Sequence, residues 1–64
     1  MIRHPKKGQR VRIHYAARYA ASMPWNGKTG RIVTVGTGKA PRNALVDTGH
    51  GAVVVPRGNL QVAP

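Results

Sequence analysis

The stretch NGKTGRIVTV, residues 26–35, could form either a phosphate-binding loop or the start of a strand in a small barrel. Choosing between these two structures decides the fold of this 64-residue chain. Gly27-Lys28-Thr29 matches the end of a phosphate-binding P-loop, which also needs a glycine five positions earlier and a helix afterwards. The earlier position is Ser22, and the residues after Thr29 are rich in β-branched side chains. The stretch therefore predicts a glycine turn that leads into a strand, and it excludes a nucleotide hydrolase of the P-loop kind.

Short β-type runs recur along the rest of the chain, separated by glycine, proline and asparagine. The run QRVRIHY alternates apolar and cationic side chains, which is the period of a half-buried strand. Evenly spaced short strands are typical of sandwiches and barrels, and this chain is too short for an immunoglobulin-type sandwich. We expect an all-β fold, a small five-stranded barrel with strands at residues 9–15, 28–36, 44–47, 52–56 and 60–62.

The segments between the strands have the composition of turns and loops. Residues 37–43 and 48–51 contain the glycine, proline and asparagine that punctuate turns. The Ala-rich segment 16–22 is compatible with a short helical turn or with an extended loop, and Pro24 ends any helix there. Both faces of the 28–36 strand are partly apolar, which suits either a barrel strand or a strand with a bulge. The chain divides into a basic N-terminal arm, 1–7, and a barrel, 8–63.

The charge balance is the strongest indication of a partner. Eleven lysines and arginines accompany one acid, Asp47, so the formal net charge is +10. Such self-repulsion lowers folding stability unless an anionic partner offsets it. Nucleic acid is the commonest partner of this kind, and an acidic protein or an anionic membrane surface is the alternative. The cations gather towards the N-terminus: Arg3, Lys6, Lys7, Arg10 and Arg12 all precede residue 14.

Several functional classes find no support in the composition. The chain has no cysteine, so it contains neither a disulfide nor a thiolate-bound metal. It lacks an apolar run of about 18–20 residues, the length of a membrane span, and the apolar core of a signal peptide. His4, His14 and His50 do not have metal-ligand spacing. We therefore expect a cytoplasmic protein without a metal or another cofactor and without a membrane partner.

A single acid also argues against acid–base catalysis, which usually needs a positioned pair of titratable groups. Asp47 is expected to form an ion pair with Arg42 or Arg57, or to cap the turn at Thr48 and Gly49. We therefore expect that the protein is not an enzyme.

Three segments, KKGQRVRI, NGKTGRIVTV and VVVPRGNLQV, together resemble the KOW-type SH3-like barrels of ribosomal proteins and transcription elongation factors. Members of this family commonly begin with G-x-x-V-x-V, carry a central Gly-x-x-Gly-x-Val/Ile and end with a segment like Val-Pro-x-x-Asn-Leu. The matching residues are Gly8, Val11 and Ile13, then Gly27, Gly30 and Ile32, and finally Val55, Pro56, Asn59 and Leu60.

The resemblance spans residues 8–63 and implies a five-stranded SH3-like barrel. It implies an aliphatic core, because the chain has no phenylalanine. The core residues expected on this basis are Val11, Ile13, Ile32, Val35, Leu45, Val54, Leu60 and Val62.

The resemblance further implies that binding uses the N-terminal arm and the long first loop, where all three aromatic residues lie among cations. Aromatic rings stack on unpaired bases with about 1–3 kcal/mol each, and basic side chains neutralise phosphates. An alternative role for Trp25 and one tyrosine is to fill a core that lacks large side chains. The expected nucleic-acid-binding residues are Lys6, Lys7, Arg10, Arg12, Tyr15, Arg18, Tyr19, Trp25, Lys28 and Arg31.

We therefore expect a nonenzymatic nucleic-acid-binding module that combines phosphate contacts with aromatic stacking and has low sequence specificity. The sequence is compatible with either DNA or RNA as the partner and does not indicate an oligomeric state. The alternative is a protein-interaction module that docks on an acidic partner in the transcription, translation or nuclease machinery. A plasmid-type dihydrofolate reductase is also similar to a small SH3-like barrel, but its Val-Gln-Ile-Tyr segment corresponds here to residues 52–55, which contain neither Gln nor Tyr.

Overall fold

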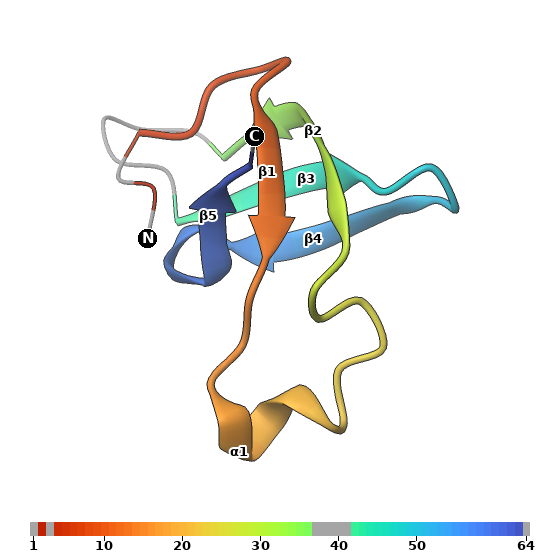
Figure 1. The fold of residues 1–64 in the computed structure, drawn as a ribbon. Coiled ribbons are helices and arrows are strands. Elements are labelled where there is room, and N and C mark those ends of the chain that lie inside the picture. Colours follow the sequence, from red (N-terminus) through yellow and green to blue (C-terminus); the bar gives the residue numbers. More distant parts are fainter. Residues whose placement is uncertain (1, 3, 37–41, 64) are drawn as a thin grey trace.

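The fold is seen in a computed structural model that describes residues 2, 4–36 and 42–63. The described chain contains five strands, one helical turn and one 3-10 turn (Figure 1). The expected strands are confirmed with small shifts at their ends, whereas most of the loop expected at 37–43 lies outside the described residues. The elements are β1 (Arg10–Ile13), α1 (Ala17–Ala20), β2 (Thr29–Val35), β3 (Asn43–Asp47), β4 (Ala52–Pro56), η1 (Arg57–Asn59) and β5 (Leu60–Val62).

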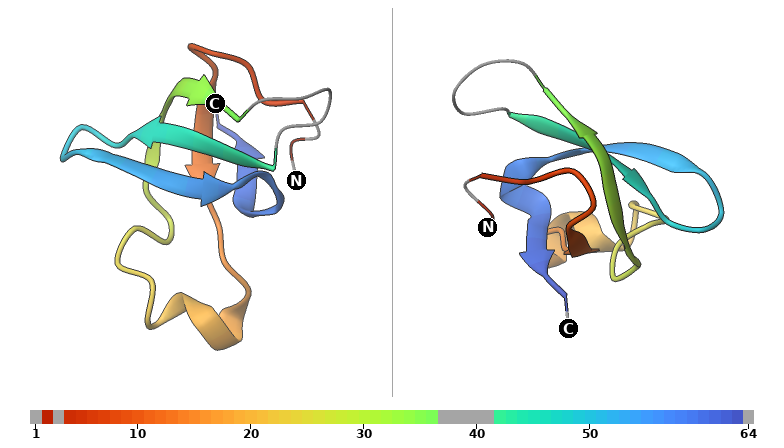
Figure 2. Two further views of the ribbon diagram at one scale, coloured as in Figure 1. Left: turned by 180° about the vertical axis from the view of Figure 1, so that it is seen from behind. Right: turned by 90° about the horizontal axis from the view of Figure 1, so that it is seen from above.

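The strands form one antiparallel sheet in the order β4-β3-β2-β1-β5. β1 and β5 make one layer and β3 and β4 the other, while β2 pairs with both β1 and β3 (Figures 1 and 2). The 3-10 turn η1 carries the chain from β4 to β5. This strand order with its 3-10 connection is the topology of a small SH3-like barrel, so the expected fold class is confirmed.

A β-bulge lets β2 serve both layers. The register between β2 and β3 shifts by one residue at Val33, between Ile32 and Thr34. In a regular strand, residues three apart point to opposite faces. Because of the bulge, Ile32 is buried and Val35 also packs against the core. The bulge was one of the two alternatives that the apolar character of both faces allowed, and the structure has it.

Six aliphatic side chains form the centre of the core, contributed by β1, β2, β3, β4 and β5. The expected members Val11, Ile13, Ile32 and Leu60 are confirmed as buried, and Val35 packs against the core. The expected core position of Leu45 is wrong, because Ala44 and Val46 of β3 point inward and Leu45, between them, points outward. The largest fully buried side chains are Ile13, Ile32, Leu60, Val11, Val46 and Val55.

The expected burial of Val54 and Val62 is wrong, since their side chains are 64% and 73% exposed. In β4 three consecutive valines show no alternation, and pairing with β3 places Val55 inward and Val54 outward. Val62 lies opposite Val11 in β5, which is an edge strand of three residues, so no further strand covers it. Cross-strand register and strand position, rather than residue type, decide both cases.

The described part of the N-terminal arm lies against the barrel. Ile2 and Pro5 are buried, and Ile2 belongs to the core cluster. The Gln9 N–H donates to the Lys6 carbonyl at 3.0 Å, which closes a turn, and the Gly8 N–H donates to the Ile32 carbonyl at 2.7 Å. These bonds carry the arm into β1 and hold it beside β2.

The long loop between β1 and β2 is fastened at its base. The Gly27 N–H donates to the Ile13 carbonyl at 2.7 Å, and the Ile13 N–H donates to the Lys28 carbonyl at 2.9 Å. Above these bonds, the Asn26 Oδ1 atom accepts a hydrogen bond from the Tyr15 N–H at 2.8 Å. Within the loop, α1 is the short helical turn that the Ala-rich segment indicated, and it lies at the end remote from the strands (Figure 1).

Gly30 permits the close approach of β2 and β3. A Cβ atom at this position would collide with the carbonyl oxygen of Asp47 and would lie 2.9 Å from the Cγ1 atom of Val46. Only glycine fits without moving the backbone of β3. Gly27 differs, because it has a φ of 84° but open space around its Cα atom.

Gly30→Ala is expected to lower the free energy of unfolding by about 3 kcal/mol, since it forces the two strands apart. Gly27→Ala is the matched control, for which only backbone strain of about 1–2 kcal/mol is expected. Urea denaturation monitored by Trp25 fluorescence measures both. A smaller loss for Gly30→Ala than for Gly27→Ala would contradict the role of the close approach.

Candidate nucleic-acid interface

The alternation of β1 places two arginines on the outer surface. Val11 and Ile13 are fully buried, so Arg10 and Arg12 point away from the core and are exposed. Residues two apart on a strand are separated by about 6.5 Å, which gives two guanidinium groups in a row. Burial of the apolar residues thus determines where these cations point.

Neighbouring strands add further polar groups to the same surface. In the antiparallel register, Arg31 of β2 lies opposite Arg10, and Thr29 lies opposite Arg12. On the other side of β1, Gln61 of β5 also lies opposite Arg12. Arg12 is therefore flanked by two uncharged polar residues, whereas Arg10 faces another cation.

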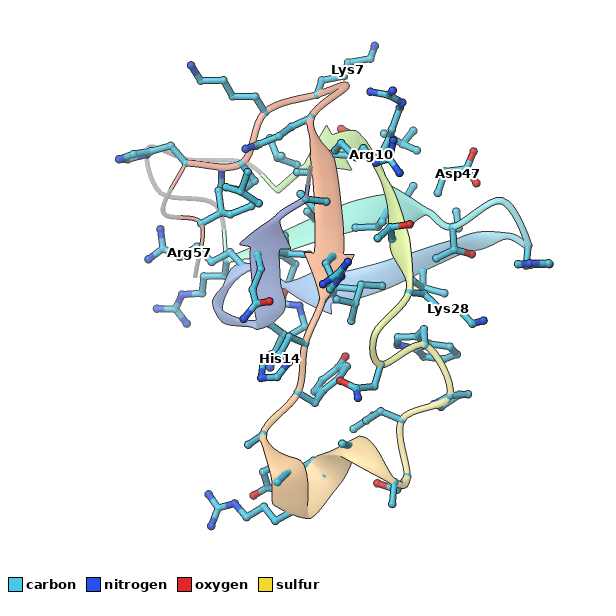
Figure 3. All side chains as sticks on the ribbon, in the orientation of Figure 1. Lys7, Arg10, His14, Lys28, Asp47 and Arg57 are labelled. Atoms are coloured by element: carbon cyan, nitrogen blue, oxygen red, sulfur yellow. The ribbon has the colours of Figure 1, made fainter. Side chains whose placement is uncertain are left out.

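Two lysines lie at the start of this surface. Lys6 and Lys7 are exposed in the turn before β1, where the Gln9 Oε1 atom accepts a hydrogen bond from the Lys6 N–H at 3.1 Å. Figure 3 shows Lys7 at the same end of β1 as Arg10. We call the set Lys6, Lys7, Arg10, Arg12 and Arg31 the basic face.

Within the described residues, no cation of the basic face forms an ion pair with a carboxylate. Asp47 is opposite Arg31 in the register of β2 and β3, but its Oδ1 atom accepts a hydrogen bond from the Gly49 N–H at 2.9 Å. Asp47 thus caps the turn at Thr48 and Gly49, as one of the sequence expectations held. Arg31 instead donates from Nη1 to the Gly8 carbonyl at 3.2 Å.

The three aromatic residues do not join the basic face. Tyr15 and Trp25 are half-buried and pack against the core, which supplies the volume that the missing phenylalanines would fill. Tyr19 is 47% exposed on α1, and the Arg18 guanidinium lies 4.9 Å from the centre of its ring. Tyr19 is therefore the aromatic ring that the fold leaves most accessible.

The structure thus divides the ten residues expected to bind nucleic acid. It brings five together on the basic face and places Arg18 and Tyr19 on the loop. Lys28 is exposed at the base of that loop, away from Lys7 (Figure 3). Sequence reasoning did not find Thr29 and Gln61, because their position beside Arg12 depends on strand register.

The described residues offer no other obvious chemistry. They contain no pocket and no group of three or more His, Cys, Asp or Glu side chains able to hold a metal ion. No helix among them is long and apolar enough to cross a membrane. The basic face is therefore the feature of the described residues that most resembles a binding site.

Comparisons with known proteins give no match to this chain, whether with protein-family models, with curated proteins or with solved structures. Function must therefore be argued from the barrel and its surfaces.

Arg10→Gln is expected to raise the free energy of unfolding by about 0.5 kcal/mol at low salt, because like charges directly opposite each other destabilise a sheet. This increase in the free energy of unfolding should become smaller at higher salt, because salt screens the repulsion between Arg10 and Arg31 in the parent protein. Thermal denaturation at two salt concentrations measures this effect. Arg18→Gln is the control, since Arg18 lies over Tyr19 and its loss should bring no gain. Equal stabilisation by both variants would contradict a specific Arg10–Arg31 repulsion.

Proposed function

We propose that the protein is a nonenzymatic nucleic-acid-binding module of the KOW-like kind, which grips the phosphate backbone with its basic face. The observation that carries the proposal is the directly opposed pair Arg10 and Arg31, neither of which forms an ion pair with a carboxylate of the described residues. Such a pair opposes folding in isolation and favours it once an anion lies between the two groups.

The spacing of the cations fits a regular polyanion. Arg10 and Arg12 are separated by about 6.5 Å along β1, and Arg10 and Arg31 face each other across about 5 Å. A nucleic-acid backbone presents charges at such repeated short intervals, whereas acidic side chains on a protein are irregularly placed. Phosphate contacts of this type position a partner without reading its sequence, so low sequence specificity follows.

The salt dependence of binding tests the proposal directly. If the basic face neutralises about five phosphates of a DNA duplex, the slope of log K against log salt should be about −4.5. Fluorescence anisotropy of a labelled duplex, titrated between about 50 and 200 mM salt, measures the slope. A slope near zero would overturn the proposal.

Arg12→Gln supplies the matched test of the face itself. Its neighbours Thr29 and Gln61 are uncharged, so the substitution should leave the barrel intact. The slope should become shallower by about one unit. Arg42→Gln removes an exposed cation at the start of β3, outside the basic face, and should change the slope less. Equal effects of the two variants would mean that net charge, rather than this face, determines binding.

A second contact is proposed at the loop, where Tyr19 stacks on an unpaired base beside Arg18. The exposed ring and the adjacent guanidinium support this role, because stacking and charge act together on single strands. Tyr19→Ala should weaken binding of a single-stranded oligonucleotide about tenfold or more, while binding of a duplex is unchanged. Tyr19→Phe keeps the ring and should bind like the parent protein. Loss of affinity in both variants, or in neither, would exclude stacking by Tyr19.

A further inference from the structure

The outer surface of β3 and β4 differs in character from the basic face. Register places Leu45 opposite Val54, and Thr34 of β2 opposite Leu45, on the side that points away from the core. Val54 is 64% exposed, and Val33 at the bulge is 40% exposed. We call Val33, Thr34, Leu45, Ala52 and Val54 the apolar face.

Three residues of this face, Leu45, Ala52 and Val54, lie in a part of the chain without lysine or arginine. Residues 43–56 contain no lysine or arginine, although the chain has eleven, and the only acid, Asp47, lies within them. Figures 1 and 2 show the layer of β3 and β4 on the opposite side of the molecule from β1. The edge strand β4 is therefore separated from β1 by β3 and β2, and β2 carries both Arg31 of the basic face and Val33 of the apolar face.

The edge of the sheet at β4 is open. β4 is the last strand in the sheet order, and its neighbour is β3. The Arg57 N–H donates to the Arg42 carbonyl at 2.7 Å, and the Thr48 N–H donates to the Gly51 carbonyl at 3.0 Å. These two bonds, one at each end of the hairpin, determine which residues of β4 bond to β3.

Hydrogen-bonded and non-hydrogen-bonded pairs alternate in an antiparallel ladder. Val53 and Val55 therefore exchange bonds with β3, whereas the backbone N–H and C=O groups of Ala52 and Val54 point towards the free edge. The backbone of Pro56 also faces the free edge. Proline has no N–H, and it is tolerated at such a position in an edge strand because no bond to the neighbouring strand is lost. The free edge thus presents two donors from Ala52 and Val54.

Little on β4 prevents another strand from pairing there. Natural sheets protect exposed edges with lysine, a central proline or a bulge. β4 has the sequence AVVVP, its ladder with β3 is regular, and its proline is terminal. A strand of this composition is suited to pairing with a neutral strand of the same kind.

From the charge-free edge, we propose that two copies of this chain pair through β4, antiparallel across a two-fold axis, and join their sheets. An antiparallel two-fold contact is self-complementary, so each copy supplies the same donors and acceptors. Pairing at this edge uses a strand without lysine or arginine and leaves β1 two strands away from the contact between two chains of net charge +10. Contact through β1 would instead bring the arginines together.

The size of the chain adds a physical reason for dimer formation. Domains of this length bury little apolar surface alone and commonly depend on disulfides, metals or oligomerisation. With no cysteine in the sequence, a disulfide is excluded. Covering Val54 and its neighbours would add apolar burial without any change in the core.

Sedimentation equilibrium of nuclease-treated protein tests the proposal, with absorbance spectra to show that no nucleic acid bridges the copies. The parent protein should form a dimer that dissociates on dilution, and added salt should strengthen it by screening the net charge. Val54→Lys should be monomeric, because it places a charge at the centre of the paired edge. Val62→Lys is the matched control, an exposed valine on the other edge strand, and should dimerise like the parent.

Ala52→Pro removes the free-edge N–H of Ala52 without adding charge and without breaking a bond to β3. It should weaken dimerisation about tenfold or more, since each dimer loses two hydrogen bonds. Circular dichroism verifies that each variant is folded, and Ala52→Pro decides the matter if Val54→Lys does not fold. A parent protein that stays monomeric at high concentration and high salt would overturn the proposal. Equal weakening by Val62→Lys, or a dimer unaffected by Ala52→Pro, would overturn it as well.

Discussion

The pleat of β1 links the core to the charged surface. Val11 and Ile13 are fully buried, and because side chains alternate along a strand, those of Arg10 and Arg12 point outward. β1 is also the strand that pairs with both β2 and β5. A slip of one residue would place two arginines in the core and expose its apolar members, so this register is strongly specified.

Electrostatic repulsion limits how the remaining surface can be arranged. Eleven cations and one acid cannot be paired within the chain, and the Asp47 carboxylate is already hydrogen-bonded within its own turn. The basic residues concentrate on β1, the turn before it and the start of β2, whereas the edge strand β4 has no charged residue. This distribution supports both proposals, an anionic partner for the basic face and a second copy of the chain at the edge of β4.

Several features follow from local sequence. Alternation in residues 9–15 predicts β1, glycine at 27 predicts the turn before β2, and the two-sided apolar strand at 28–36 is compatible with the bulge that the structure places at Val33. Each feature depends on residues that are neighbours in sequence. The pleat of a strand explains β1, the need for a positive φ explains the turn at Gly27, and the distribution of apolar residues over two faces relates to the bulge. For the same reason Arg10, Arg12 and Arg31 could be identified as exposed cations without coordinates.

The sequence by itself determined the strands, the fold class and which cations lie on the outer side of β1. Only the tertiary structure decided that Val55 rather than Val54 is buried, that Trp25 packs against the core, and that Tyr19 stands apart from the arginines. Those outcomes depend on cross-strand register and on where a long loop folds back, and both are set by residues distant in the chain. Three consecutive valines could place either the middle one or the outer two in the core, so the pairing with β3 determines which of them are buried.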